Sequence, residues 1–186
     1  MGKINYFDDI KIGNEIFSLS HLNPKYLEFY GQKVQKTLKL KVLYSDHCFT
    51  ARVNRSVSDS ERVFSIERYN LSKLLPNIIE GLNNDKIQVF QTLARRNFAY
   101  VVKTTLNDKD YNIFFEVKKS NNSNPDCDLV IRIESAYVFD NDCKLEYSGK
   151  IRFLISDFHP SRNSSHRSMV SRSRKDSQAQ SGQNGP

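Results

Sequence analysis

Three residues whose side chains can do chemistry stand next to one another in "LYSDHCFT", residues 43–50. Asp46, His47 and Cys48 would supply a carboxylate, an imidazole and a thiol, the groups of a Cys–His nucleophilic site or of a metal site. Adjacent residues of a strand, however, point to opposite faces of the sheet. A strand continuing through this stretch therefore separates His47 from Cys48, so that they cannot share one hydrogen bond.

The residues before this stretch predict which way each side chain faces. From Thr37 onward, apolar residues alternate with others, and Lys39 and Lys41 lie on the side opposite the apolar ones. Cys48 continues the apolar side and is predicted to be a buried, inert cysteine. A Cys48-dependent enzyme is the alternative hypothesis. His47 falls on the lysine side, where an imidazole can titrate near neutrality and act as a general acid or base; the alternative is an exposed histidine without a role.

Arg68, in "ERYNL", is the second candidate. Its planar guanidinium matches a phosphate group with two hydrogen bonds, which favours a phosphate-binding role. The alternative is that Arg68 solvates the start of a helix.

The third candidates are Glu116 and Lys118, which share one face of a predicted strand. With Arg132 and Glu134 of the next strand they form either a solvated face with cross-strand ion pairs or an RNA-binding surface. On that next strand, alternation places two sets on opposite faces: Leu129, Ile131, Ile133, Ser135 and Tyr137 against Arg132, Glu134 and Ala136.

RNA cleavage without a metal ion requires only such groups. The 2′-OH of the substrate is the nucleophile, a histidine or glutamate moves protons, and an arginine or lysine stabilises the charged phosphorane. The predicted catalytic set is His47, Arg68, Glu116 and Lys118, with no cofactor and no metal.

The elements that must position this set belong to an α+β fold. Apolar residues at helical spacing over residues 71–82 predict one amphipathic helix, which Pro76 either starts or kinks. Residues 54–62 read as a loop. Four β-rich segments with short polar connections predict a four-stranded antiparallel meander: 98–106, 111–119, 128–139 and 149–158. N-terminal strands and the helix would pack on this sheet.

Composition divides the chain of 186 residues into a domain and a tail. Residues 1–159 are predicted to form a single domain. Residues 160–186 are rich in Ser, Arg, Gln and Gly and are predicted to be disordered, because they cannot bury enough apolar surface. Five basic residues and one acidic residue give the tail a net charge of +4, out of +7 for the chain. The tail is either a solvated extension or a basic arm that contacts RNA or a membrane.

Several classes of protein lose support. Three cysteines at irregular spacing do not form a disulfide framework or a zinc-finger pattern. No segment has the length of a signal peptide or of a membrane span, so a cytoplasmic protein with reduced thiols is predicted. Walker, GxGxxG, GxSxG and HExxH motifs are absent from the sequence.

Six segments in order resemble a family of small bacterial proteins found on prophages and plasmids, some of them labelled "stationary phase growth adaptation protein". They are "LKVLYSDHCFT", "ERYNLSKLLPNII", "NFAYVV", "YNIFFEVKK", "IESAYVFD" and "GKIRFLISDFH". The resemblance covers roughly residues 12–160 and implies kinship without an activity.

A weaker resemblance, at the level of the fold, is to the barnase, EndoU, colicin E5/D and RelE group of nucleases. It rests on a helix before a four-stranded sheet and on a strand like "IESAYV". This resemblance implies a metal-independent RNase-like toxin or effector that acts on RNA. The alternative function is a binding module without catalysis, for a host protein or for nucleic acid. The sequence sets no oligomeric state.

Overall fold

A computed structural model describes residues 6–54, 61–83, 87–92, 100–106, 109–121, 125–138 and 145–158. The α+β class is confirmed. The predicted tail, residues 160–186, lies outside the described residues.

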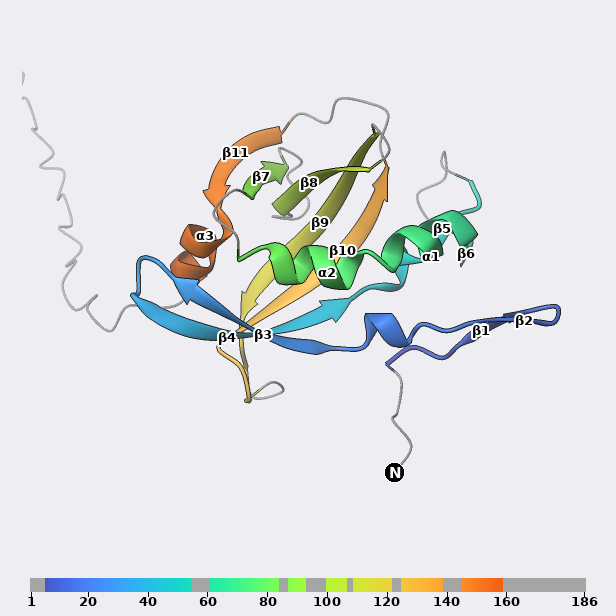
Figure 1. The fold of residues 1–186 in the computed structure, drawn as a ribbon, viewed down its shortest axis with the longest axis horizontal. Helices are drawn as coiled ribbons and strands as arrows, with labels where there is room; N and C mark the ends of the chain where they lie inside the picture. Colours follow the sequence, from blue (N-terminus) through green and yellow to red (C-terminus); the bar gives the residue numbers. More distant parts are fainter. Residues whose placement is uncertain are drawn as a thin grey trace, which may run out of the picture.

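Within the described residues, seven strands form one curled sheet (Figure 1). In sheet order the strands are β11 (Leu145–Lys150), β7 (Gln88–Thr92), β8 (Tyr100–Leu106), β9 (Lys109–Lys119), β10 (Leu129–Val138), β4 (Lys36–Tyr44) and β3 (Lys25–Gly31). The predicted segments 98–106, 111–119 and 128–139 correspond to β8, β9 and β10, which pair antiparallel as expected.

The predicted four-stranded antiparallel meander is nevertheless wrong. β4, from the N-terminal part of the chain, joins the sheet in parallel beside β10, with Leu129 opposite Leu40 and Ile133 opposite Tyr44. β3 then pairs antiparallel with β4. The mixed sheet therefore brings the end of "LKVLY" next to "IESAYV", and this neighbourhood positions the candidate site.

The last predicted strand, residues 149–158, is the second correction. Only its first two residues belong to β11, and Ile151–Phe158 form the helix α3. Gly149 has φ +112°, a conformation that favours glycine, and it lies just before the change. Ile151, Leu154 and Ile155 are buried at helical spacing, so the apolar pattern of this segment has period 3.6 instead of 2.

The predicted amphipathic helix is present but bent. It consists of α1 (Ile66–Ser72) and α2 (Leu75–Gly81). Pro76 lies in the first turn of α2, where its missing N–H costs no helical hydrogen bond. The side chain of Ser65 accepts from the backbone N–H of Arg68 and caps the start of α1. Proline and serine thus set where each half begins.

Short elements complete the described fold. β1 (Ile10–Ile12) and β2 (Glu15–Phe17) form a hairpin that extends away from the sheet (Figure 1). η1 (Ser20–Leu22) follows it, and η2 (Asp46–Cys48) follows β4. β5 (Thr50–Arg52) and β6 (Arg62–Phe64) pair antiparallel and lead into α1. No described helix is long and apolar enough to cross a membrane.

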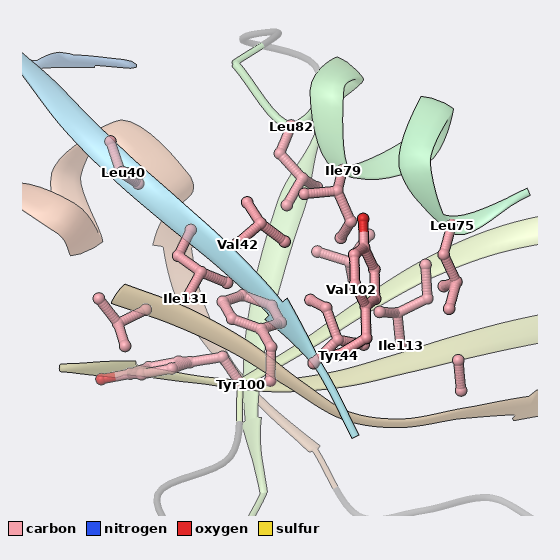
Figure 2. Packing of buried hydrophobic residues seen from close by; sticks show 14 of the residues in the cluster. Leu40, Val42, Tyr44, Leu75, Ile79, Leu82, Tyr100, Val102, Ile113 and Ile131 are labelled. Carbon is pink, nitrogen blue, oxygen red and sulfur yellow. The ribbon is translucent and has the colours of Figure 1, made fainter. Parts of the chain in front are cut away.

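The core lies between the sheet and the helices. Figure 2 shows Leu75, Ile79 and Leu82 from α2 and its end pointing toward the sheet, where Val42 and Ile113 meet them. All five side chains are at most 1% exposed. The side chains on this face of the sheet therefore pack in the hydrophobic core.

We expect Ile79→Ala to lower the free energy of unfolding by about 2–5 kcal/mol, because the deletion leaves a cavity where α2 meets the sheet. Urea unfolding followed by circular dichroism measures this loss. Ile66→Ala, at a 56%-exposed position of α1, is the matched control. Equal losses for the two variants would contradict the described packing of α2.

The opposite sheet face is called the outer face below. It is made of the alternate residues of β3, β4, β10 and β9 that point away from the core. Its described side chains are Tyr26, Glu28, Tyr30, Thr37, Lys39, Lys41, Leu43, Val130, Arg132, Glu134, Glu116, Lys118 and Phe114. Each of them is exposed or half-buried.

Candidate functional site

The residues of "SDHC", 45–48, form a turn at the end of β4. The backbone N–H of Ser45 donates to the carbonyl oxygen of Ile133 at 2.9 Å, and Asp46–Cys48 then form the 3₁₀ turn η2. The side chain of Ser45 accepts from the N–H of His47 at 3.2 Å and caps the turn. The predicted strand alternation therefore stops at Ser45, because a serine cap follows the last strand residue.

Cys48 is buried, as predicted. Its Sγ lies 3.8 Å from the carbonyl oxygen of Ile133, and burial raises the pKa of the thiol to about 12. A thiol that stays protonated at neutral pH is a poor nucleophile. The thiol is therefore a packing group of η2.

His47 is half-exposed, with 41% of its side chain accessible to solvent, and its Nε2 lies 3.9 Å from a carboxylate oxygen of Asp46. Partial burial holds the pKa of His47 below its ordinary value, and the positive charge of Arg62 acts in the same direction. Asp46 opposes this shift, while Arg68 and Arg52 add to it. The imidazole is therefore mostly neutral at pH 7 and can accept a proton.

Arg68 lies directly beside His47. Its Nη1 donates to the carbonyl oxygen of His47 at 2.9 Å and to Oγ of Ser135 at 3.5 Å. The guanidinium carbon lies 4.8 Å from the centre of the Tyr137 ring, a cation–π geometry. Helix α1, turn η2 and strand β10 together hold this side chain, so its position is well defined.

A β-bulge in β10 creates that meeting point. Ile133 pairs with Phe115 and Ser135 pairs with Phe114, so Glu134 is an extra residue. The bulge reverses the alternation that follows it. The prediction that Ser135 and Tyr137 share the face of Ile133 is therefore wrong.

After the bulge, Ala136 takes the core side, where it is fully buried opposite Ile113. Ser135 and Tyr137 consequently turn to the outer face, where they contact Arg68. Alternation alone could not reveal this role.

Arg62 and Arg52 extend the positive charge around His47. They are directly opposite each other in the β5–β6 ladder. Nε and Nη2 of Arg62 donate to Oγ1 and the carbonyl oxygen of Thr50, at 2.9 and 2.7 Å. Burial lowers the pKa of Arg62, and Arg68 also lowers it. Like charges placed opposite each other destabilise a sheet, and an anion bound between them would relieve this cost.

Glu116 and Lys118 are on the outer face of β9, where they lie opposite Arg132 and Val130 of β10. Lys118 Nζ forms an ion pair with Glu116 at 2.5 Å, and Arg132, opposite Glu116, pairs with Glu134 at 2.8 Å. Burial raises the pKa of Glu134, and the charge of Arg132 opposes that shift.

The four predicted catalytic residues thus form two pairs: Arg68 donates to the His47 carbonyl oxygen, and Lys118 forms an ion pair with Glu116. The Phe114 ring lies between the pairs and stacks on Tyr137 with ring centres 5.3 Å apart. We call the first pair, with Arg52, Arg62, Ser135 and Tyr137, the His47–Arg68 site.

A pocket of about 490 Å³ lies elsewhere, between α2 and the strands β7 and β8. Ile78, Phe90 and Val102 are among its lining residues, and none of the four predicted catalytic residues lines it. Among the described residues, no group of three or more His, Cys, Asp or Glu side chains could hold a metal ion.

The chain matches the YjaZ family over residues 9–156 and belongs to that family. No curated protein and no solved structure matches it. This match confirms the predicted resemblance to a bacterial family, but only as membership of a family. The prophage or plasmid origin and the fold-level likeness to nucleases stay predictions.

Proposed function

We propose that this protein cleaves RNA without a metal ion, at the His47–Arg68 site. One observation supports this function above others: a half-exposed, mostly neutral imidazole lies among the positive charges of Arg52, Arg62 and Arg68. Such a group can remove a proton, while guanidinium groups bind and stabilise a phosphate.

In the proposed reaction, His47 takes the proton of the ribose 2′-OH and becomes an imidazolium. The 2′ oxygen attacks the adjacent phosphorus, and Arg68 stabilises the negative charge of the phosphorane. The bond from phosphorus to the 5′ oxygen breaks, and that oxygen receives a proton from water. The products are a 2′,3′-cyclic phosphate and a 5′-OH, and His47 returns its proton to solvent.

Ser135 and Tyr137 act in this proposal as positioning residues. Ser135 Oγ accepts a hydrogen bond from Arg68, and the Tyr137 ring supports the guanidinium from one side. Glu116 and Lys118 are assigned to contacts with RNA away from the reacting phosphate, because Phe114 and Tyr137 lie between them and Arg68.

The direct experiment incubates the purified full chain with total RNA in the presence of EDTA. The proposal expects RNA fragments from the wild type and far fewer from His47→Ala. RNA that stays intact with the wild type, or that is cut equally by His47→Ala, overturns it.

The pH dependence gives a second prediction. A general base must be neutral, so the cleavage rate should rise with pH through the pKa of His47, which burial holds below its ordinary value, and level off above that pKa. Arg62→Gln removes the positive charge that lowers the pKa of His47 most. The pKa of His47 should therefore rise, and the rise of the cleavage rate should move to higher pH.

Proton NMR of the His47 ring follows this titration directly. His21, whose Nε2 lies 2.8 Å from Oγ of Ser72, is the internal control. Burial and the charge of Lys73 lower its pKa, so it should titrate as in the wild type. An unchanged His47 titration in Arg62→Gln would contradict the described electrostatics.

The second candidate function is a binding module without turnover. The separate Glu116–Lys118 ion pair favours it, because those two charges satisfy each other away from the imidazole. For nucleic acid this function predicts salt-dependent binding with no fragments, whereas an affinity that does not respond to salt would favour a host protein.

A toxin or effector role is tested by expression in bacteria: wild type should arrest growth and His47→Ala should not.

A further inference from the structure

We infer that the outer face of β3 and β4 binds a single-stranded nucleic acid whose bases stack on Tyr26 and Tyr30. This inference rests on the proposed function, because it supplies the path by which a strand would reach the His47–Arg68 site. It also names the substrate class as single-stranded.

The aromatic side chains are the first observation. Tyr26 and Tyr30 are 47% and 44% exposed, although both rings belong to strand β3 of the main sheet. They share the outer face with Glu28 between them, and four residues of extended chain separate them by about 13 Å. Exposed rings on a sheet give bases of any sequence a surface for stacking.

The basic side chains are the second observation. Lys41 is directly opposite Tyr26 in the β3–β4 ladder, and Lys39 Nζ lies 5.0 Å from the centre of the same ring. An ammonium held over an aromatic ring is placed next to any base that stacks there, within reach of its phosphate. Glu28 lies opposite Lys39 and moderates the local charge, so stacking supplies more of the affinity here than charge does.

The third observation is that this surface continues to the proposed reaction site. Leu43, on the outer face of β4, is opposite Arg132 of β10, and Ser135 follows beyond the bulge. From Tyr26 to Ser135 the path crosses two strand spacings and about four residues, on the order of 15–20 Å. A strand of roughly six nucleotides, within the 4–16 nucleotides that one OB fold covers, would span this surface.

A duplex does not fit this chemistry, because its bases are paired and stacked on each other and cannot reach the tyrosine rings. The outer face therefore selects unpaired nucleic acid, while the arginines of the His47–Arg68 site bind phosphates of any strand. The two surfaces make separable contributions, and variants can distinguish them.

The test measures binding of a fluorescent single-stranded oligodeoxythymidylate of about 12 nucleotides, a length within known site sizes. This probe has no 2′-OH and stays intact in the proposed reaction. The double variant Tyr26→Thr/Tyr30→Thr keeps β-branched residues on the strand. The matched control is Tyr147→Thr, which changes a 60%-exposed tyrosine on β11 at the other edge of the sheet.

The double variant should bind the probe more weakly, by about 5- to 150-fold for each lost stacking partner. Its affinity for an abasic strand of equal length should be unchanged, and Tyr147→Thr should behave as the wild type. An unchanged affinity for the probe, or an equal loss for the abasic strand, overturns the inference. RNA cleavage that persists in that case leaves the proposed function standing, whereas tyrosine-dependent binding without cleavage overturns only the proposed function.

Discussion

Replacing His47 by glutamine should lower the rate of RNA cleavage by about 10²–10⁴-fold, the range typical of a lost general base. Glutamine keeps a polar side chain of similar length at this half-exposed position, but it cannot accept the proton of the 2′-OH. Binding of RNA should change little, because Arg52, Arg62 and Arg68 remain. Initial rates on a single-stranded RNA with EDTA, with affinity measured by fluorescence anisotropy, separate the two effects.

Cys48→Ala is the matched control for this variant. It removes the neighbouring chemical group, whose thiol is buried and protonated at neutral pH, so the cleavage rate of the folded variant should stay near that of the wild type. Loss of cleavage in Cys48→Ala with an unchanged melting temperature would point to the thiol and contradict the role given to His47.

Replacing Arg68 by lysine should lower the cleavage rate by about 10²–10³-fold, as expected when one preorganised donor to the transition state is lost. Lysine keeps the charge, but it cannot bond the His47 carbonyl and Ser135 while lying flat against Tyr137. The rate at saturating RNA should fall more than the affinity.

Lys73→Gln is the matched control for Arg68→Lys. The Lys73 ammonium lies 4.3 Å from the centre of the Tyr69 ring, so this variant also disrupts a contact between a cation and an aromatic ring, but outside the His47–Arg68 site. Its cleavage rate should match that of the wild type. A rate for Arg68→Lys that equals the Lys73→Gln rate would contradict the role of the guanidinium.

Elements that local patterns determine could be predicted from the sequence. The period-two alternation of residues 37–45 gave the strand β4, and the spacing of Leu75, Ile79 and Leu82 gave the face of α2 that meets the sheet. The inward position of Cys48 also followed from the apolar side of β4, although the chain turns at Ser45. Such patterns depend only on neighbours in the sequence, so they can be interpreted without knowledge of the whole fold.

Long-range pairing could not be predicted in the same way. The parallel contact between β4 and β10 joins segments about ninety residues apart, and no turn signal specifies it. The strand predicted at residues 149–158 failed because a short apolar run fits either period, and the spacing of Ile151, Leu154 and Ile155 already matched a helix.

The candidate site shows the same division. Its two chemically distinctive residues, His47 and Arg68, were found by side-chain type, and the structure places them in contact. Alternation predicts Ser135 and Tyr137 on the face of Ile133, and this prediction is wrong because one extra residue, Glu134, reverses the alternation in β10. The only sequence signal for these two positions is the predicted resemblance that rests in part on "IESAYV".

Cleavage of a DNA oligonucleotide with a single internal ribonucleotide, in EDTA, tests the central claim most directly. If His47 activates a ribose 2′-OH beside Arg68, the wild type cuts only after the ribonucleotide and leaves a 2′,3′-cyclic phosphate, which mass spectrometry identifies. A strand that stays intact, or that is cut equally well when every sugar is deoxyribose, would contradict the account.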